Sequence, residues 1–122
     1  MRVRLRRVYE PPGPDAEEGF RVLVDRVWPR GLSRDRLELD AWLRELAPSN
    51  ELRRWFGHRP ERWEEFQARF RAELQGGERS RLLEELAERA RRGTVTLLYG
   101  ARDPERNQAV VIGDVLRERL RS

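Results

Sequence analysis

The order of extended and helical segments is the feature that most constrains the fold of this chain. Residues 3–9 alternate apolar and basic side chains, and residues 20–25 and 94–99 are short runs rich in Val, Leu and Thr, which is typical of β-strands. A long stretch with helical spacing separates the second run from the third. A connection of that length is typical of a right-handed crossover between parallel strands. The pattern therefore predicts the α/β fold class.

Apolar residues recur at helical spacing in five segments. Four of them lie between the second and third strands: one around residues 39–46, one capped by Ser49, one that begins at Pro60 and one that ends at Gly93. The fifth, at residues 109–120, closes the chain. We therefore expect a small three-stranded, mainly parallel sheet covered by about five helices.

The orientation of the first strand is open at this point. Residues 10–19 are rich in proline and too few for a crossover helix, which favours a hairpin. An extended proline loop would also span the distance needed to return the chain for parallel pairing. In either case a chain of 122 residues forms one modest core, so we expect a single domain over residues 1–122.

Composition excludes several classes of protein. Cysteine is absent, which excludes disulfide frameworks, thiol catalysis and thiolate metal sites. All 26 basic residues are arginine, which excludes lysine Schiff bases and P-loop lysines. The net charge of +4 is too small to favour nucleic acid as a partner. No apolar run approaches membrane-spanning length and no signal-peptide pattern opens the chain, so we expect a cytoplasmic protein without a membrane partner.

Polar and aromatic residues gather where the second and third strands end. Open α/β sheets bind ligands beyond the carboxyl ends of their strands, and these two ends converge if the strands are parallel neighbours. Arginine suits a phosphate or carboxylate, and tryptophan or tyrosine beside it suits a planar group. We therefore predict a site for a small anionic, phosphate- or nucleotide-like ligand, formed by Asp25, Arg26, Trp28, Arg30, Tyr99, Arg102 and Asn107.

The same residues also have a purely structural interpretation. Asp25 paired with Arg26 or Arg30 would hold a turn, and Asp103 followed by Pro104 would cap the last helix. Both interpretations stand on local spacing alone.

A nucleic-acid-binding module is the alternative function. It would use Arg53, Arg54 and Arg59 together with the basic first strand. We do not favour it, because Trp55 and Phe56 between these arginines fit the buried face of a helix and leave only the arginines outside.

No catalytic motif is complete. His58 is the only histidine, which excludes a polyhistidine metal site, and no serine lies in a nucleophile elbow. Asp25 and Asp103 would suit Mg²⁺, but neighbouring arginines compete for both carboxylates. We therefore predict no metal and no other cofactor, while the sequence leaves catalysis and oligomeric state open.

A family resemblance runs through the whole chain. Its strongest motif is Asp-Arg-Val-Trp-Pro-Arg-Gly at residues 25–31, and it continues through Leu-Asp-Ala-Trp at 39–42, Pro-Ser-Asn-Glu-Leu-Arg at 48–53 and Thr-Leu-Leu-Tyr-Gly-Ala-Arg-Asp at 96–103. In these motifs the chain resembles the YeaO-like proteins of domain-of-unknown-function family 488. The resemblance implies no established reaction.

Longer relatives in that family resemble this chain at the same two strand ends. There an Asp-Val-Arg motif follows the second strand and a Cys-His-Arg motif opens the last helix. Asp25 and Arg26 match the first motif, whereas Asn107, Gln108 and Ala109 replace the second. The resemblance therefore implies that thiol- or histidine-dependent chemistry of longer relatives does not carry over. Those relatives also look like they carry a helix between their first two strands, and this resemblance favours a parallel first strand here.

Overall fold

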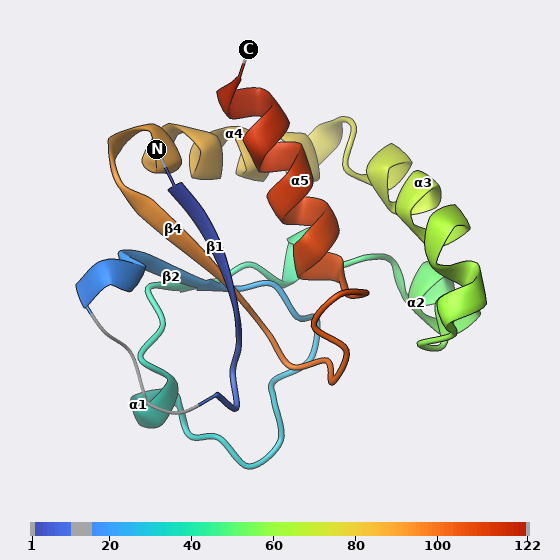
Figure 1. The fold of residues 1–122 in the computed structure, drawn as a ribbon, viewed down its shortest axis with the longest axis horizontal. Coiled ribbons are helices and arrows are strands. Elements are labelled where there is room, and N and C mark those ends of the chain that lie inside the picture. The colour runs from blue at the N-terminus through green and yellow to red at the C-terminus, as the bar shows by residue number, and fades with distance from the viewer. Residues whose placement is uncertain (1, 11–15, 122) are drawn as a thin grey trace.

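The computed structural model describes residues 2–10 and 16–121. Among these residues, four strands form one sheet, with β4 (Thr94–Tyr99) and β2 (Phe20–Leu23) in the middle and β1 (Arg2–Arg7) and β3 (Ala41–Trp42) at the edges (Figure 1). Every pairing in the sheet is parallel. The predicted α/β class and the parallel first strand are confirmed, whereas the expected count of three strands was wrong by one.

The additional strand, β3, replaces the helix that was expected around residues 39–46. A helix does begin earlier, as α1 (Arg34–Leu37), but Glu38 adopts a left-handed φ of 48° and ends it. The Asp40 carboxylate then accepts a hydrogen bond from the Arg21 backbone N–H at 2.8 Å, and β3 pairs with β2. The helical spacing of the apolar residues was misleading because the open edge of β2 offered backbone partners that favour an extended chain.

The other predicted helices are confirmed. The Ser49 hydroxyl accepts a hydrogen bond from the Leu52 N–H at 3.2 Å, so Ser49 caps its helix as expected. The last helix is capped by the Asn107 side chain and not by Asp103. The helical segments that follow β3 are the 3-10 turns η2 (Arg44–Leu46) and η3 (Pro60–Arg62) and the helices α2 (Asn50–Phe56), α3 (Trp63–Glu73), α4 (Gly77–Arg92) and α5 (Gln108–Leu120).

Helices α4 and α5 pack beside each other on one face of the sheet (Figure 1). Gly113 lets α5 approach closely, since a Cβ there would come within 3.0 Å of Leu5 and 3.8 Å of Leu97. Apolar side chains from the strands and from all the helices except α1 form a continuous core here. Burial of each large aliphatic side chain stabilises the fold by about 1.5–3 kcal/mol, so this face contributes most of the hydrophobic stabilisation.

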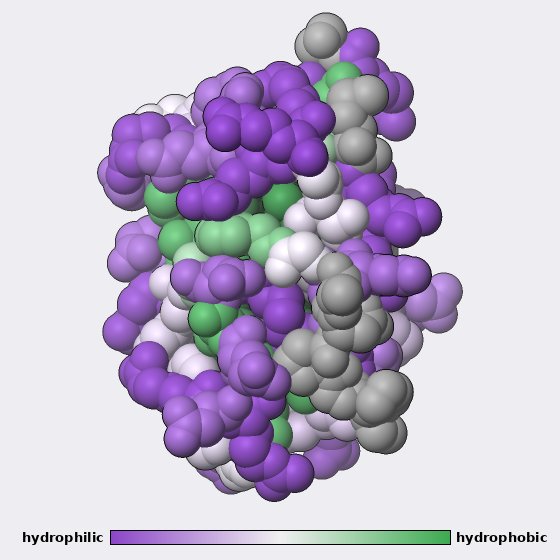
Figure 2. Space-filling model, turned by 90° about the vertical axis from the view of Figure 1, so that its left-hand side faces the viewer, coloured by the Kyte–Doolittle hydropathy of each residue, from purple (hydrophilic) through white to green (hydrophobic). Residues whose placement is uncertain are grey.

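The opposite face of the sheet is much more polar. It carries a fully buried carboxylate, Glu18 in the 3-10 turn η1 (Ala16–Glu18), which forms ion pairs with Arg6 of β1 and Arg21 of β2. We call these three residues the Glu18 network. Figure 2 shows that hydrophilic residues cover most of the side of the molecule that lies on the left in Figure 1. Part of the predicted proline loop, residues 11–15, lies outside the described residues.

No helix within the described ranges is long and apolar enough to cross a lipid bilayer.

Candidate functional site

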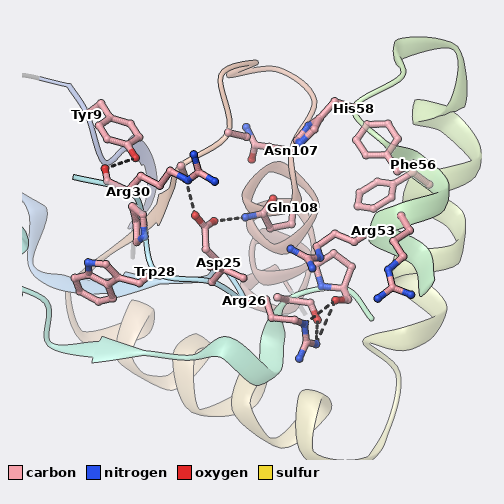
Figure 3. A pocket seen from close by; sticks show the side chains of 18 residues that line it. Tyr9, Asp25, Arg26, Trp28, Arg30, Arg53, Phe56, His58, Asn107 and Gln108 are labelled. Carbon is pink, nitrogen blue, oxygen red and sulfur yellow. Dashed lines mark hydrogen bonds between the residues drawn. The ribbon is translucent and has the colours of Figure 1, made fainter. Parts of the chain in front are cut away.

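A cavity of about 650 Å³ lies at the carboxyl end of the sheet. Figure 3 shows Trp28 and Tyr9 on one side of it and Arg53, Phe56 and His58 on the other. The cavity is therefore framed by the loops that follow the strands on one side and by helix α2 on the other. Its lining residues are Tyr9, Asp25, Arg26, Val27, Trp28, Pro29, Arg30, Ala47, Pro48, Arg53, Arg54, Phe56, His58, Phe66, Gly100, Ala101, Asn107 and Gln108.

Asp25 ties three elements together at the inner wall of this pocket. Its carboxylate accepts hydrogen bonds from the backbone N–H of Gly100 at 2.9 Å and from the side-chain amide of Gln108. Its backbone carbonyl accepts a hydrogen bond from the Trp42 indole at 2.7 Å. Gly100 suits its position because a Cβ there would lie 2.8 Å from the Asp25 carboxylate. Asp25 therefore joins the ends of β2 and β4 to the first turn of α5.

Burial raises the pKa of Asp25 from 3.8 to about 6. The largest cause is the removal of the charged carboxylate from water, which outweighs the hydrogen bonds from Gly100 and Gln108 and the positive charge of Arg53, all of which lower the pKa. The fold thus favours the neutral acid more than an unfolded chain does. A side chain that titrates close to neutral pH in a pocket is a common property of functional sites.

Arginine dominates the charge of the pocket. Four arginines line it, at positions 26, 30, 53 and 54, whereas Asp25 is the one acidic residue among its described lining residues. Arg26 is held in place, because its guanidinium donates to the carbonyls of Pro48 at 3.2 Å and Ala47 at 3.3 Å. Arg30 and Arg54 are exposed, and neither side chain has a partner within the described part of the chain. Among the described residues, the positive charge of the pocket is therefore only partly compensated.

The rim of the pocket is partly aromatic. The Trp28 indole donates to the Leu32 carbonyl at 2.7 Å, and its ring meets Trp42 edge to face at a centroid distance of 5.3 Å. Tyr9 donates its hydroxyl to the carbonyl of Arg30 at 2.8 Å. Tyr9 and Val27 are the large hydrophobic side chains that stay exposed among the described residues, at 39% and 61%, and both line the pocket. The rim thus offers apolar surface next to the arginines.

The structure brings five of the seven predicted site residues to the pocket and leaves two outside it. Tyr99 packs into the core beneath the helices and is 3% exposed, and this burial raises the pKa of its hydroxyl. Arg102 is exposed but does not line the pocket. Asn107 lines it, yet both polar atoms of its side chain already have partners in the cap of α5. The five residues that line the pocket are Asp25, Arg26, Trp28, Arg30 and Asn107.

Sequence reasoning missed several lining residues. Gln108 follows the helix cap directly after a strand end, so its position in the first turn of α5 was a usable signal. Arg53, Arg54 and His58 carried no such signal, because local spacing does not reveal where α2 folds. Within the described ranges, no group of three or more potential metal-ligating side chains gathers in one place.

Comparisons with known proteins place the chain among uncharacterised relatives. The family model described as "Inactive DUF488-N3 subclade" matches residues 2–122. An uncharacterized protein of Mycobacterium tuberculosis, Rv3073c, is 42% identical over 118 residues, which cover 97% of this chain and 96% of that protein. The uncharacterized protein YeaO of Escherichia coli is 38% identical over 117 residues, which cover 96% and 98%. No solved structure matches the chain.

Proposed function

This chain belongs to domain-of-unknown-function family 488, as a YeaO-like protein, and from that premise we propose that its strand-end pocket binds a small phosphate- or nucleotide-like anion. The description of the matching subclade as inactive supports binding without catalysis. So does the absence of cysteine and the presence of a single histidine.

The observation that carries the proposal is the charge of the pocket. Four arginines surround one carboxyl group, and Arg30 and Arg54 have no partner among the described residues. Guanidinium groups bind phosphate and carboxylate oxygens through paired, charge-assisted hydrogen bonds. An anion in the pocket would therefore supply negative charge that the described residues around it do not.

The rim supports a ligand with a planar or apolar part. Trp28, Tyr9 and Val27 line the pocket beside Arg30, so a base or sugar ring would have apolar surface to contact. A cavity of about 650 Å³ lies within the range of small-molecule sites and has room for more than a bare phosphate ion.

Calorimetric titration with inorganic phosphate, ribose 5-phosphate and adenosine monophosphate tests the proposal. We expect Arg30→Ala and Arg54→Ala each to weaken binding by about tenfold or more, because each removes a charge-assisted hydrogen bond. Arg92→Ala is the matched control, since Arg92 is exposed in the last turn of α4, just before the amino end of β4, and does not line the pocket. The proposal is wrong if none of these anions binds, or if the pocket variants behave like the control.

Part of the basic surface that the nucleic-acid alternative requires is not available for binding. Two arginines of the first strand are used inside the fold: Arg6 pairs with Glu18, and Arg7 donates to the Ala101 carbonyl at 2.8 Å. The exposed Arg2 and the arginines on and after α2 remain for it. Titration with short RNA and DNA distinguishes the two, because polynucleotide binding would fall by about 10³-fold between 50 and 200 mM salt if six phosphates were contacted.

A further inference from the structure

The pocket combines hydrogen-bond acceptors with arginine donors, and the acceptors indicate which donor groups a ligand should have. An ionised carboxylate only accepts hydrogen bonds and offers about four lone-pair positions. The contacts with Gly100 and Gln108 use two of them at Asp25. Gln108 donates through its Nε2 atom, which leaves its Oε1 as a further acceptor without a partner in the described part of the chain. Asp25 and Gln108 therefore form an acceptor pair on the pocket wall.

A bare phosphate ion does not suit this acceptor pair. At neutral pH it carries only one or two P–OH donors, and these lie on the same small group whose charged oxygens would bind the arginines, so it cannot engage the arginines and the acceptor pair as fully as a larger ligand with separate donors. A ligand that fits both groups best carries an anionic group for the arginines and separate hydrogen-bond donors for Asp25 and Gln108.

The charge of the pocket also decides which kind of donor fits. Four lining arginines would repel a ligand ammonium group, and the one lining carboxylate offsets little of that repulsion. Hydroxyl groups donate hydrogen bonds without adding positive charge. The acceptor pair therefore favours hydroxyls.

We infer that the ligand is a phosphate monoester with free hydroxyl groups, such as a sugar phosphate, whose hydroxyls bind Asp25 and Gln108 while its phosphate binds arginines that line the pocket. This inference rests on the proposed anion site and names the ligand class for it. The sugar could be free or part of a nucleotide, since the recognised chemistry is the same.

The test compares two ligands that differ only in their hydroxyl groups. Ribose 5-phosphate and tetrahydrofurfuryl phosphate share a phosphate on a five-membered ring, but only the first carries ring hydroxyls. We expect the folded wild-type protein to bind ribose 5-phosphate at least about tenfold more tightly, because the hydroxyls bind a charged acceptor. Adenosine monophosphate in the same titration shows whether a base adds affinity to the sugar phosphate.

Two variants assign that preference to residues. Asp25→Asn should reduce the preference for ribose 5-phosphate to about twofold, because the amide loses charge and acceptor capacity. Arg54→Ala should weaken both ligands by the same factor and keep the preference. Asp114→Asn is the control, since Asp114 lies on α5 outside the pocket and its contact with Arg117 is a 3.6 Å surface pair.

The outcomes separate this inference from the proposed function. Equal binding of both phosphate esters by the wild-type protein would overturn the hydroxyl inference and leave the anion site intact. A preference that survives in Asp25→Asn would also overturn it. Binding of neither ester would overturn the anion site itself, and the inference with it.

Discussion

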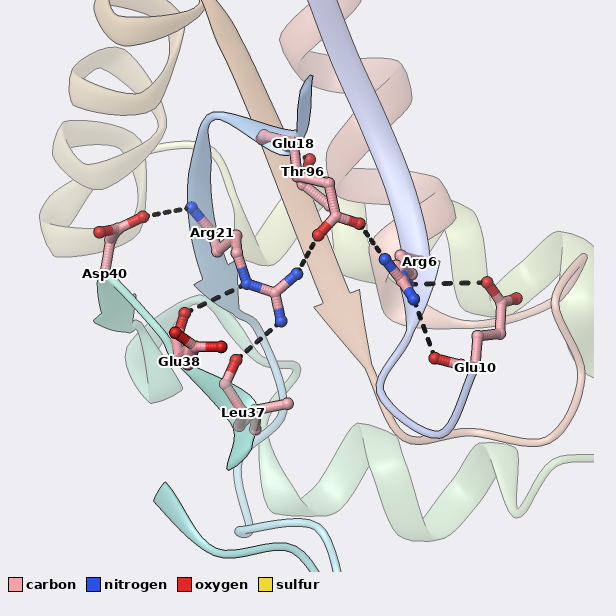
Figure 4. Close-up of polar contacts among 8 residues, drawn as sticks. All are labelled: Arg6, Glu10, Glu18, Arg21, Leu37, Glu38, Asp40 and Thr96. Carbon is pink, nitrogen blue, oxygen red and sulfur yellow. Dashed lines mark hydrogen bonds and ion pairs between the residues drawn. The ribbon is translucent and has the colours of Figure 1, made fainter. Parts of the chain in front are cut away.

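Two groups of arginines in this molecule make opposite use of charge. In the Glu18 network, two arginines converge on one fully buried carboxylate, and Arg21 also donates to the carbonyls of Leu37 at 2.7 Å and Glu38 at 3.1 Å (Figure 4). In the strand-end pocket, four arginines line a cavity with one carboxyl group, and two of them have no partner among the described residues. The first group has its counter-charge within the fold, whereas the second includes two arginines without a partner among the described residues, and we propose that an anion completes it.

This comparison separates arginines that hold the fold from arginines that are available for a ligand. A buried ion pair is costly to form, but removing one partner is strongly destabilising because the other charge stays buried without compensation. An exposed arginine without a partner contributes little to stability. Arg26 belongs to the first kind although it lines the pocket, because carbonyls of the η2–α2 connection accept its hydrogen bonds.

The largest effect is expected in the Glu18 network. Glu18→Ala leaves Arg6 and Arg21 without their shared carboxylate, so we expect the free energy of unfolding to fall by about 3–5 kcal/mol. Urea denaturation measures it. Glu88→Ala is the control, because Glu88 pairs with Arg92 on the exposed surface of α4 and its loss should change the free energy of unfolding far less. Equal effects of the two substitutions would contradict the distinction between the two groups of arginines.

Asp25 is expected to make the stability of the protein depend on pH. Its pKa is 3.8 in the unfolded chain and about 6 in the fold, so the folded state binds the proton more tightly. The corresponding stability is fully present below pH 3.8 and is lost as the pH rises through 6, by roughly 2–3 kcal/mol.

Asp25→Asn isolates this contribution, because the amide resembles the neutral acid. The Asn oxygen still accepts from the Gly100 N–H, and its NH₂ donates to Gln108 Oε1 once the Gln108 amide turns over. We expect the variant to gain stability relative to the wild-type protein between pH 4 and pH 7.5, as measured by urea denaturation across that range. A difference that stays constant with pH would show that the Asp25 carboxyl is not destabilised by burial.

The smallest effect on stability is expected for the arginines without partners. Arg30→Ala and Arg54→Ala should each change the free energy of unfolding by less than about 0.5 kcal/mol. The same substitutions should weaken anion binding by about tenfold or more. Thermal melting with and without phosphate measures both quantities in one series. A large loss of stability without ligand would place these arginines with those that hold the fold.

The sequence predicted the elements whose signals are local. The strand at residues 94–99, the Ser49 cap and the helices that follow it are confirmed, because cap residues and apolar spacing act within a few residues of chain. The predicted helix around residues 39–46 is wrong, because strand pairing with β2 and the left-handed Glu38 decided that segment. Strand pairing depends on residues that are distant in the sequence, so the local pattern of apolar residues did not reveal it.

The site could be predicted only as far as the strand ends determine it. The rule that ligands bind beyond the carboxyl ends of parallel strands led to Asp25 and Arg30, which line the pocket. The same rule suggested Tyr99 and Arg102, which do not line the pocket. The rule identifies the ends of the strands but does not say in which direction each side chain points there. The opposing wall, with Arg53 and Arg54, depends on where α2 lies relative to the strand ends, which local sequence patterns do not determine.

A phosphate titration followed by ¹H–¹⁵N NMR tests the central claim most directly. The claim predicts saturable shifts that centre on the Gly100 amide, the Gln108 side-chain amide and the Trp28 indole N–H, since all three lie on the pocket. The Arg92 signals should stay unchanged. Shifts that are absent, or that spread evenly over arginines outside the pocket, would contradict the assignment of an anion site to the strand ends.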